Sequence, residues 1–323
     1  MPINSTKEKR KLRIVFMGTP DFAVKSLDAL YEAGYNIVGV ITAPDRPAGR
    51  GRKVQYSAVK KYALGKDLRL LQPSNLKDVD FLNELKGLQA NLQVVVAFRM
   101  LPKVVWQLPE FGTFNLHASL LPDYRGAAPI NWAIINGEQE TGVTTFFIDE
   151  KIDTGQIILQ EKTAIGSEET AGSLHDKLMY QGAALVIQTL QLIEEDQVRA
   201  ISQKEASTVK SAPKLFKETC QIDWNQSLDT IYNHIRGLSP YPTAWTYLYD
   251  EDQKQILKLY EVRKELEPHT YKVGQVIVAK KMLKIAVDQG YIVLEKIQLE
   301  GKKAMPVKEL LNGLRLSEKA NVR

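Results

Sequence analysis

Residues 12–42 read LRIVFMGTPDFAVKSLDALYEAGYNIVGVIT, and this stretch decides the fold class. LRIVFM (12–17) is a short apolar run typical of a buried strand, and DFAVKSLDALYEAG (21–34) has helical spacing and ends at Gly34. NIVGVIT (36–42) is a second apolar run that favours a strand. A strand, a helix and a strand in this order predict the start of a parallel α/β sheet.

The same alternation continues through the first two-thirds of the chain. LQVVVAF (92–98) is nearly all apolar, as expected for a strand that is buried on both faces of a parallel sheet. Strands are also expected over 141–149 and 155–164, followed by a long amphipathic helix over 167–196. This part of the chain is therefore predicted to form an α/β, doubly wound, Rossmann-like sheet.

The pattern changes after ASTVKSAPKLFKE (206–218), a polar connector that contains proline. A helix is expected at about 226–237, and five short apolar runs between 243 and 301 predict a small, OB-like antiparallel β-barrel. The predicted division is a disordered basic arm, a first domain, a linker and a barrel domain, at 1–11, 12–207, 208–214 and 215–323.

The composition limits the class of protein. With 323 residues, 44% hydrophobic and 25% charged, the chain is expected to form two ordinary globular domains. No apolar run approaches the roughly 20 residues of a membrane span, and the N-terminus has no signal-peptide pattern. The single cysteine, Cys220, excludes an internal disulfide. A cytoplasmic, monomeric protein is expected.

The positive charge is concentrated in the last third of the chain. Residues 1–205 carry 24 Lys and Arg against 24 Asp and Glu, whereas residues 206–323 carry 19 against 14. A basic module beside a neutral one indicates an anionic partner. The alternative is a solvated, lysine-rich surface without a partner.

Several common active-site motifs are absent. The first predicted strand is followed by GTPDF (18–22) rather than G-x-G-x-x-G, so dinucleotide binding is unsupported. The chain has no phosphate-binding loop, no G-x-S-x-G motif and no histidine or cysteine pair at metal-ligand spacing. The predicted chemistry therefore uses no metal, hydride transfer or serine nucleophile.

FNLHASLLPDYRG (114–126) is the main candidate for an active site. In an extended strand, Asn115 and His117 point to the same face, where an amide and an imidazole can hold the oxygen of a tetrahedral intermediate. Asp153 lies in a D-T-G turn, and a carboxylate near an imidazole fixes its tautomer. From the residues alone, a structural Asn–His pair and a turn-forming aspartate are the more common interpretations.

Taken together, FNLHASLLPDYRG, the following residues to IDEKIDTG, and GTPDFA resemble the folate-dependent formyltransferases. The resemblance covers nearly the whole chain after the N-terminal arm, including IRGLSPYPTAW in the second domain. It implies that Asn115, His117 and Asp153 are catalytic. It also implies that 10-formyltetrahydrofolate is the formyl donor and that the acceptor is the α-amino group of methionine on initiator tRNA.

The resemblance also implies which residues bind the folate. The SLLP motif would contribute Ser119, Leu120, Leu121 and Pro122. The segment LQVVVAFRMLP (92–102) would line the pterin pocket, mainly through backbone groups around Phe98, Met100 and Leu101. Two positions depart from the family pattern: Asp123 stands where a basic or amide residue is expected, and Arg99 stands where relatives often have a glycine-containing segment.

PDRPAGRGRK (44–53) is a basic loop whose composition fits either a solvated loop or a nucleic-acid contact. The resemblance favours contact with the tRNA acceptor stem. The residues predicted to bind tRNA are Arg46, Arg50, Arg52, Lys53 and, in the linker, Lys214. Two other functions remain open: formyl transfer to another acceptor, such as an amino-sugar nucleotide, and RNA binding without catalysis on the same scaffold.

Overall fold

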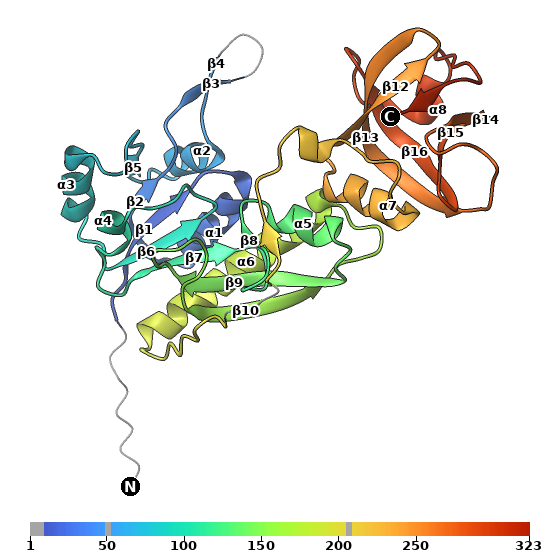
Figure 1. Cartoon of the computed structure of the whole chain (residues 1–323). Helices are drawn as coiled ribbons and strands as arrows, with labels where there is room; N and C mark the ends of the chain where they lie inside the picture. Colours follow the sequence, from blue (N-terminus) through green and yellow to red (C-terminus); the bar gives the residue numbers. More distant parts are fainter. Residues whose placement is uncertain (1–9, 49–52, 205–208) are drawn as a thin grey trace. The chain divides into compact units, whose positions relative to one another are not determined.

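The computed structural model describes residues 10–48, 53–204 and 209–323, and they form two compact units (Figure 1). The first unit contains residues up to Gly126 together with Gly142–Thr163 and His175–Ser211. The second contains Ala127–Thr141, Ala164–Leu174 and Ala212–Arg323. None of the helices in the described ranges combines the length and the apolar character that a membrane span requires.

A mixed seven-stranded sheet forms the centre of the first unit. The strands lie in the order β10-β9-β7-β6-β1-β2-β5. Their bounds are Ile157–Ala164, Glu140–Phe147, Thr113–His117, Leu92–Val96, Arg13–Gly18, Asn36–Ile41 and Leu70–Leu71. The strands from β5 to β7 are parallel, whereas β9 runs antiparallel to β7. The predicted α/β fold is therefore confirmed, with an antiparallel strand beyond β7.

Helices and a small hairpin surround this sheet. The helices are α1 (Asp21–Glu32), α2 (Ala58–Gly65), α3 (Val79–Gly87), α4 (Lys103–Trp106) and α6 (Ala171–Glu194). The short strands are β3 (Arg46–Ala48), β4 (Lys53–Gln55) and β8 (Arg125–Gly126). Ser57 and Asp78 cap the first turns of α2 and α3, which explains where these helices begin.

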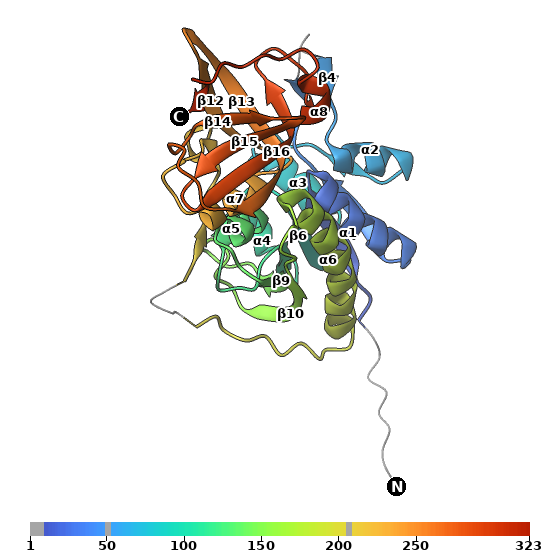
Figure 2. The same cartoon turned by 90° about the vertical axis from the view of Figure 1, so that its right-hand side faces the viewer.

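Each face of the sheet is covered by a different set of helices. Leu76, Phe81, Leu85 and Val105, from α3, α4 and the loop before α3, form one core with Val15 of β1 and its neighbours. On β7, Leu116 approaches Gly182 of α6 so closely that a Cβ at Gly182 would lie 2.7 Å from a Leu116 methyl group. α6 therefore covers the Leu116 side of the strand. Figure 2 shows α6 beside α1.

The second unit is built around an antiparallel barrel. Its main strands are β12 (Ala244–Asp250), β13 (Gln253–Leu266), β14 (Val276–Ala279), β15 (Met282–Val287), β16 (Gly290–Leu299) and β18 (Asn321–Val322), with β17 (Met305–Pro306) paired to β16. The order is β14-β15-β16-β13-β12-β18, and a bridge between Gln275 and Asn321 joins the two edges. The OB-like barrel is confirmed.

Helices complete the second unit. They are α5 (Pro129–Ile135), the 3-10 helix η1 (Glu218–Cys220), α7 (Leu228–Gly237) and α8 (Val307–Leu310); β11 covers Ser211–Ala212. Arg236 of α7 is buried, and its guanidinium donates to the carbonyl oxygens of Gly166 and Glu169. This contact explains why residues 164–174 group with the barrel rather than with the sheet.

The element boundaries differ modestly from the predicted ones. The helix predicted at 167–196 begins at Ala171, because Gly166–Thr170 form a turn in which Glu169 accepts from the Gly166 N–H. The predicted division at 12–207, 208–214 and 215–323 stays a prediction, and the compact units follow contacts that cross it. Of the predicted arm, residues 1–9 lie outside the described residues, and the backbone N–H of Arg10 donates to the carbonyl of Glu194.

Candidate active site

Strand β7 places Asn115 and His117 on one side of the sheet, opposite the side that Leu116 presents to α6. Asn115 pairs with Val95 on β6 and with Phe146 on β9, so it lies in the middle of the sheet. Its side chain is half-buried, and its amide makes no hydrogen bond to any residue within the described ranges. A half-buried amide with unused hydrogen-bonding capacity is suited to binding a ligand.

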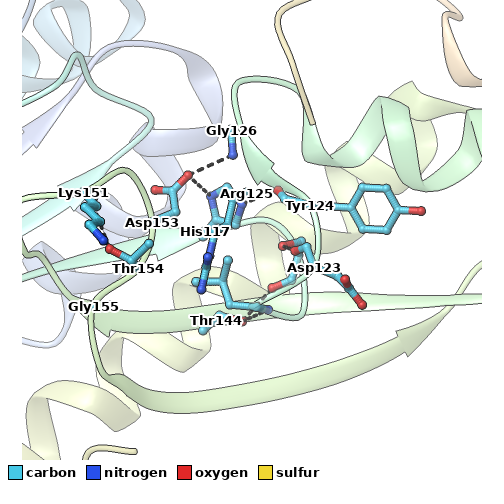
Figure 3. Close-up of polar contacts among 12 residues, drawn as sticks. His117, Asp123, Tyr124, Arg125, Gly126, Thr144, Lys151, Asp153, Thr154 and Gly155 are labelled. Atoms are coloured by element: carbon cyan, nitrogen blue, oxygen red, sulfur yellow. Dashed lines mark hydrogen bonds and ion pairs between the residues drawn. The ribbon is translucent and has the colours of Figure 1, made fainter. Parts of the chain in front are cut away.

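His117 is held in one tautomer by the backbone that follows it. Its Nε2 lies 2.9 Å from the carbonyl oxygen of Tyr124, and because a carbonyl only accepts, Nε2 must donate. The other ring nitrogen, Nδ1, lies 3.9 Å from Oδ2 of Asp153 (Figure 3). The imidazole is 7% exposed and the carboxylate 16% exposed. The structure thus brings His117 and Asp153 together, which the sequence did not establish.

Asp153 stands in a loop that needs an unusual backbone. Its φ is 55°, in the left-handed region, which aspartate tolerates better than most residues. Oδ2 of Asp153 accepts from the backbone N–H of Gly126 at 3.0 Å. Two residues on, a Cβ at Gly155 would lie 1.7 Å from the carbonyl oxygen of Phe147, so only glycine fits there. The D-T-G turn therefore both forms the loop and aims the carboxylate.

Gln203 is a site residue that no sequence pattern singled out. Its Nε2 donates to the carbonyl oxygens of Asp153 at 2.9 Å and Gly155 at 2.8 Å. Its Oε1 accepts from Nε and Nη2 of Arg125 at 3.1 and 2.6 Å. One amide thus holds the Asp153 loop and the arginine of the R-G motif, although it belongs to no motif in the sequence.

The SLLP motif forms a tightly bonded turn. Ser119 is fully buried, and its Oγ donates to the carbonyl of Asp123 at 2.6 Å. Thr144 on β9 donates to the Ser119 carbonyl at 2.6 Å and accepts from the Leu121 N–H at 3.2 Å. These bonds fix the turn that carries the Tyr124 carbonyl beneath His117. The predicted folate contacts of residues 119–122 stay predictions.

Both positions that depart from the family pattern have local partners. Oδ1 of Asp123 accepts from the backbone N–H of Lys210 at 3.0 Å, which ties the turn after SLLP to a distant segment. The Arg99 guanidinium donates to the carbonyl oxygens of Pro73 and Ser74. Arg99 therefore links the loop after β6 to the loop after β5.

The predicted folate-pocket residues after β6 lie in different environments. Met100 is 69% exposed, whereas Leu101 is buried and Phe98 is partly buried. Met100 and Leu101 line a cavity of about 800 Å³. A role of these residues in binding the pterin stays a prediction.

The residues predicted to bind tRNA are described only in part. Arg46 is exposed at the start of β3, and Lys53 lies in β4, while Arg50 and Arg52 lie outside the described residues. Lys214 is exposed, with its ammonium 5.7 Å from the centre of the Phe216 ring. Their role in tRNA binding stays a prediction.

The base of this basic hairpin is held by a cluster that the sequence analysis did not single out. Nζ of Lys60 pairs with Oδ2 of Asp45 at 2.5 Å and donates to Oε1 of Gln72 at 2.8 Å. Gln72 in turn donates to the Ala43 carbonyl and to Asp45. The Lys60 ammonium also lies 4.0 Å from the centre of the Tyr56 ring, so the cluster joins both ends of the hairpin.

Comparison with known families identifies both parts of the chain. A family model described as formyl transferase matches residues 12–190. A second model, described as the formyl transferase C-terminal domain, matches residues 214–315. Together the two models cover most of the chain.

Individual relatives agree with the family models. A protein of Flavobacterium johnsoniae named methionyl-tRNA formyltransferase is 60% identical over 312 residues, 97% of this chain and 99% of that protein. A protein of the same name from Bacteroides thetaiotaomicron is 54% identical, over 96% of this chain and 98% of that protein. The resemblance seen in the sequence is confirmed.

A solved structure agrees in fold. The N-formyltransferase of Helicobacter canadensis, in complex with folinic acid and dTDP-3-aminofucose, superimposes with a TM-score of 0.62 over 88% of this chain and 98% of that chain. At 22% identity this likeness shows the fold alone. On the family models and the close relatives, the chain belongs to the formyl transferase family, among the methionyl-tRNA formyltransferases.

Proposed function

We propose that this protein transfers the formyl group of 10-formyltetrahydrofolate to the α-amino group of methionine on initiator tRNA. One observation carries the proposal. The unbonded amide of Asn115 shares a strand face with His117, whose free ring nitrogen lies 3.9 Å from Asp153. An amide donor, an imidazole that donates from Nδ1 when the ring is protonated, and a nearby carboxylate are the groups that acyl transfer to an amine requires.

The residues present fit a formyl donor of this kind. The amide of Asn115 has hydrogen-bonding capacity that the protein itself does not use, and it lies beside the buried imidazole. Residues 119–122 and the segment around Phe98, Met100 and Leu101 would hold the folate. When bound, 10-formyltetrahydrofolate supplies a formyl carbon that is open to attack by an amine.

Each member of the proposed trio has a separate task. Asn115 donates its amide N–H to the formyl oxygen as negative charge develops there. His117 keeps its Nε2 proton on the Tyr124 carbonyl, so Nδ1 is the nitrogen that can donate to the same oxygen when the ring is protonated. Asp153 uses Oδ2 to accept from Gly126, and its Oδ1 can take the proton of the attacking amine through a water.

The acceptor would contact both units. The basic hairpin that begins at Arg46 and the exposed Lys214 offer positive charge to the phosphate backbone. On the barrel, the Lys254 ammonium lies 3.8 Å from the Tyr247 ring centre, and the Arg323 guanidinium 5.2 Å from that of Tyr249. A cytoplasmic enzyme is part of this proposal, because charged tRNA is used where translation takes place. The prediction of a monomer is kept with it.

The alternatives are less well supported. The solved relative bound to an amino-sugar nucleotide is only 22% identical to this chain, whereas methionyl-tRNA formyltransferases reach 60%. A non-catalytic RNA-binding protein would have no need of the geometry around His117. The direct test is formyl transfer from 10-formyltetrahydrofolate to methionylated initiator tRNA, with uncharged initiator tRNA and methionylated elongator tRNA as controls. RNA binding without transfer would overturn the proposal.

Asn115→Ala and Asp153→Ala test the proposed trio. Removal of one preorganised donor costs roughly 100-fold to 1,000-fold in kcat, and removal of a general base costs about 100-fold to 10,000-fold. Each variant should therefore lose turnover by about 100-fold or more and keep its affinity for tRNA. Asn83→Ala and Asp80→Ala, on α3, are the matched controls. Turnover within about threefold of the wild type would remove that residue from the trio.

A further inference from the structure

Strand β12 of the second unit carries a row of aromatic side chains on one face. Trp245, Tyr247 and Tyr249 stand at every second position, so they point to the same side of the strand. Neighbouring rings of the row lie edge to face, with their centres 5.2 Å and 6.4 Å apart. The residues between them point the other way, and Leu248 belongs to the barrel core. The aromatic row therefore lies on the outer face of the barrel.

The row is anchored at one end and open at the other. Trp245 is buried, and its Nε1 donates to the carbonyl oxygen of Lys217 at 2.8 Å. Tyr247 and Tyr249 are only half-buried, and neither hydroxyl has a hydrogen-bond partner in the described ranges. The two tyrosines therefore present part of their surface to solvent, on a strand whose position is fixed.

Cations stand over the faces of these rings. The Lys254 ammonium lies 3.8 Å from the centre of the Tyr247 ring and 5.5 Å from that of Tyr249. The Arg323 guanidinium lies 5.2 Å from the Tyr249 ring centre. An ammonium at 3.8 Å leaves no space for another side chain between it and the ring. This face of Tyr247 is therefore covered by a flexible, exposed lysine rather than by the core.

The positive charge beside the row is not neutralised. On β13, Lys254 lies directly opposite Tyr249, and Lys258 lies directly opposite Trp245, so both lysines share the outer face (Figure 1). Four cations border the row without a carboxylate partner in the described part of the chain: Lys217, Lys254, Lys258 and Arg323. Other lysines of the barrel strands do pair with carboxylates: Lys264, Lys284 and Lys296. The cations beside the aromatic row are therefore available to an anion.

We propose that this row binds unpaired nucleotides of single-stranded RNA, whose bases stack on Tyr247 and Tyr249 while their phosphates meet Lys254 and Lys258. Aromatic rings beside a basic track hold single strands because every base has a flat face. A base takes the ring face that the Lys254 ammonium covers, and the ammonium moves to a neighbouring phosphate. The inference goes beyond the proposed function, since it requires neither methionine on the RNA nor the formyl donor.

The combination of rings and cations distinguishes this site from a general phosphate contact. Lysines alone would suffice to attract the phosphates of any RNA, whether paired or unpaired. They give no reason for two partly exposed tyrosines whose hydroxyls have no partner in the described ranges. In a paired helix the faces of the bases are stacked on one another, so only unpaired bases can use these rings.

The test compares two labelled oligomers by fluorescence anisotropy on the full chain: an oligoadenylate of about eight nucleotides, and an abasic ribose-phosphate oligomer of the same length. The wild type should bind the oligoadenylate about fivefold or more tightly, because stacking of one base contributes at least that factor. Tyr249→Leu should remove most of this preference, whereas Tyr249→Phe, which keeps the ring, should retain it.

Three further variants complete the comparison. Tyr271→Leu makes the same change at an exposed tyrosine of the second unit outside the row, and it should keep the preference. Lys254→Gln should weaken the binding of both oligomers, since both carry phosphates. Lys86→Gln removes an exposed charge from α3 in the first unit and should change neither affinity.

The outcomes separate this inference from the proposed function. Equal affinity of the wild type for both oligomers would overturn the stacking site, as would an equal loss of preference in Tyr271→Leu. An unchanged preference in both Tyr247→Leu and Tyr249→Leu would also overturn it. Tyr247 packs against the barrel core, so Tyr249→Leu remains informative if Tyr247→Leu does not fold. Absence of formyl transfer with an intact preference for the oligoadenylate would contradict only the proposed function.

Discussion

At the scale of single residues, the candidate site depends on backbone carbonyls as much as on charged groups. The carbonyl of Tyr124 determines which nitrogen of His117 carries the permanent proton. Tyr124 itself has a φ of 60°, and its N–H donates to the carbonyl of Lys210. The tautomer of the imidazole therefore follows from a turn whose geometry is fixed by a residue 86 positions later in the chain.

Gln203→Ala tests how far the site depends on such support. Loss of the bonds to Asp153 and Gly155 should loosen the loop, and because small misplacements cost up to about 100-fold, kcat should fall by roughly tenfold or more. Steady-state kinetics with both substrates would show a fall in kcat with KM values nearly unchanged. Gln197→Ala, an exposed position, is the control. A change in KM alone would argue for direct substrate binding instead.

At the scale of elements, the basic hairpin β3–β4 is fastened at its base by three polar side chains. Lys60 of α2 is only 12% exposed and meets Asp45 before β3. The hydrogen bond from Lys60 is the main reason that the pKa of Asp45 is lowered, and the bond from Gln72 adds to it. The direction of the hairpin therefore depends on α2 and on the loop after β5.

Lys60→Met should weaken the use of tRNA without affecting the folate. The charge-assisted bonds to Asp45 and Gln72 disappear, so the hairpin is held less well, and KM for charged tRNA should rise by roughly threefold to tenfold. Lys61→Met removes the neighbouring exposed lysine and is the matched control. Lys60→Arg keeps the positive charge, so its KM for charged tRNA should lie between those of the wild type and Lys60→Met. An equal rise in KM for the folate would contradict a role confined to the hairpin.

Helix α7 contains a buried histidine, His234, whose titration should make the stability of the second unit depend on pH. Burial lowers the pKa of His234 from 6.5, and a hydrogen bond to the Cys220 backbone opposes this only in part. As the pH falls through about 6.5, the unfolded chain takes up a proton that the folded chain does not. The free energy of unfolding should therefore decrease below this pH.

His234→Asn provides the corresponding measurement. The variant keeps a side-chain donor but has no group that titrates, so its free energy of unfolding should fall less between pH 7 and pH 5 than that of the wild type. Denaturant unfolding at a series of pH values, followed by tryptophan fluorescence, gives the slope of the free energy of unfolding against pH for the variant and for the wild type. Identical slopes would show that His234 does not contribute to acid sensitivity.

At the scale of the whole molecule, charge and topology are divided between two units. The last 118 residues carry the whole excess of positive charge, 19 against 14. Much of this part is a barrel closed by the chain's final residues, since the Arg323 N–H donates to the Tyr247 carbonyl and the Tyr247 N–H donates back to Arg323. Aromatic rings of β12 on this surface are accompanied by the cations Lys254 and Arg323.

Added salt should lower kcat/KM for charged tRNA much more than it changes KM for the folate. Binding of RNA phosphates releases counterions, so kcat/KM for charged tRNA should fall steeply between about 50 and 200 mM salt, whereas KM for a monoglutamate folate should change little. Lys254→Gln should lower kcat/KM for tRNA at low salt and reduce the salt slope. Lys86→Gln serves as the comparison. A salt slope equal to that of the wild type would exclude Lys254 from the RNA contact.

The sequence by itself predicted the fold of both parts of the chain and one face of the candidate site. The apolar runs and helical spacing of residues 12–42 predicted the α/β sheet, and the later short runs predicted the barrel, because local periodicity reports directly which faces are buried. The pattern of FNLH placed Asn115 and His117 on one face, and the strand β7 has that geometry. The resemblance then indicated the family, which the relatives confirm.

Only the tertiary structure decided how these parts are supported. Gln203 lies 50 residues from Asp153, and Lys60 meets Gln72 from a different element, so no local pattern reveals either contact. Arg99 looked like a departure from the family until its bonds to the carbonyl oxygens of Pro73 and Ser74 appeared. Periodicity is a property of neighbouring residues, whereas the tautomer of His117 and the aim of Asp153 depend on groups that meet only after folding.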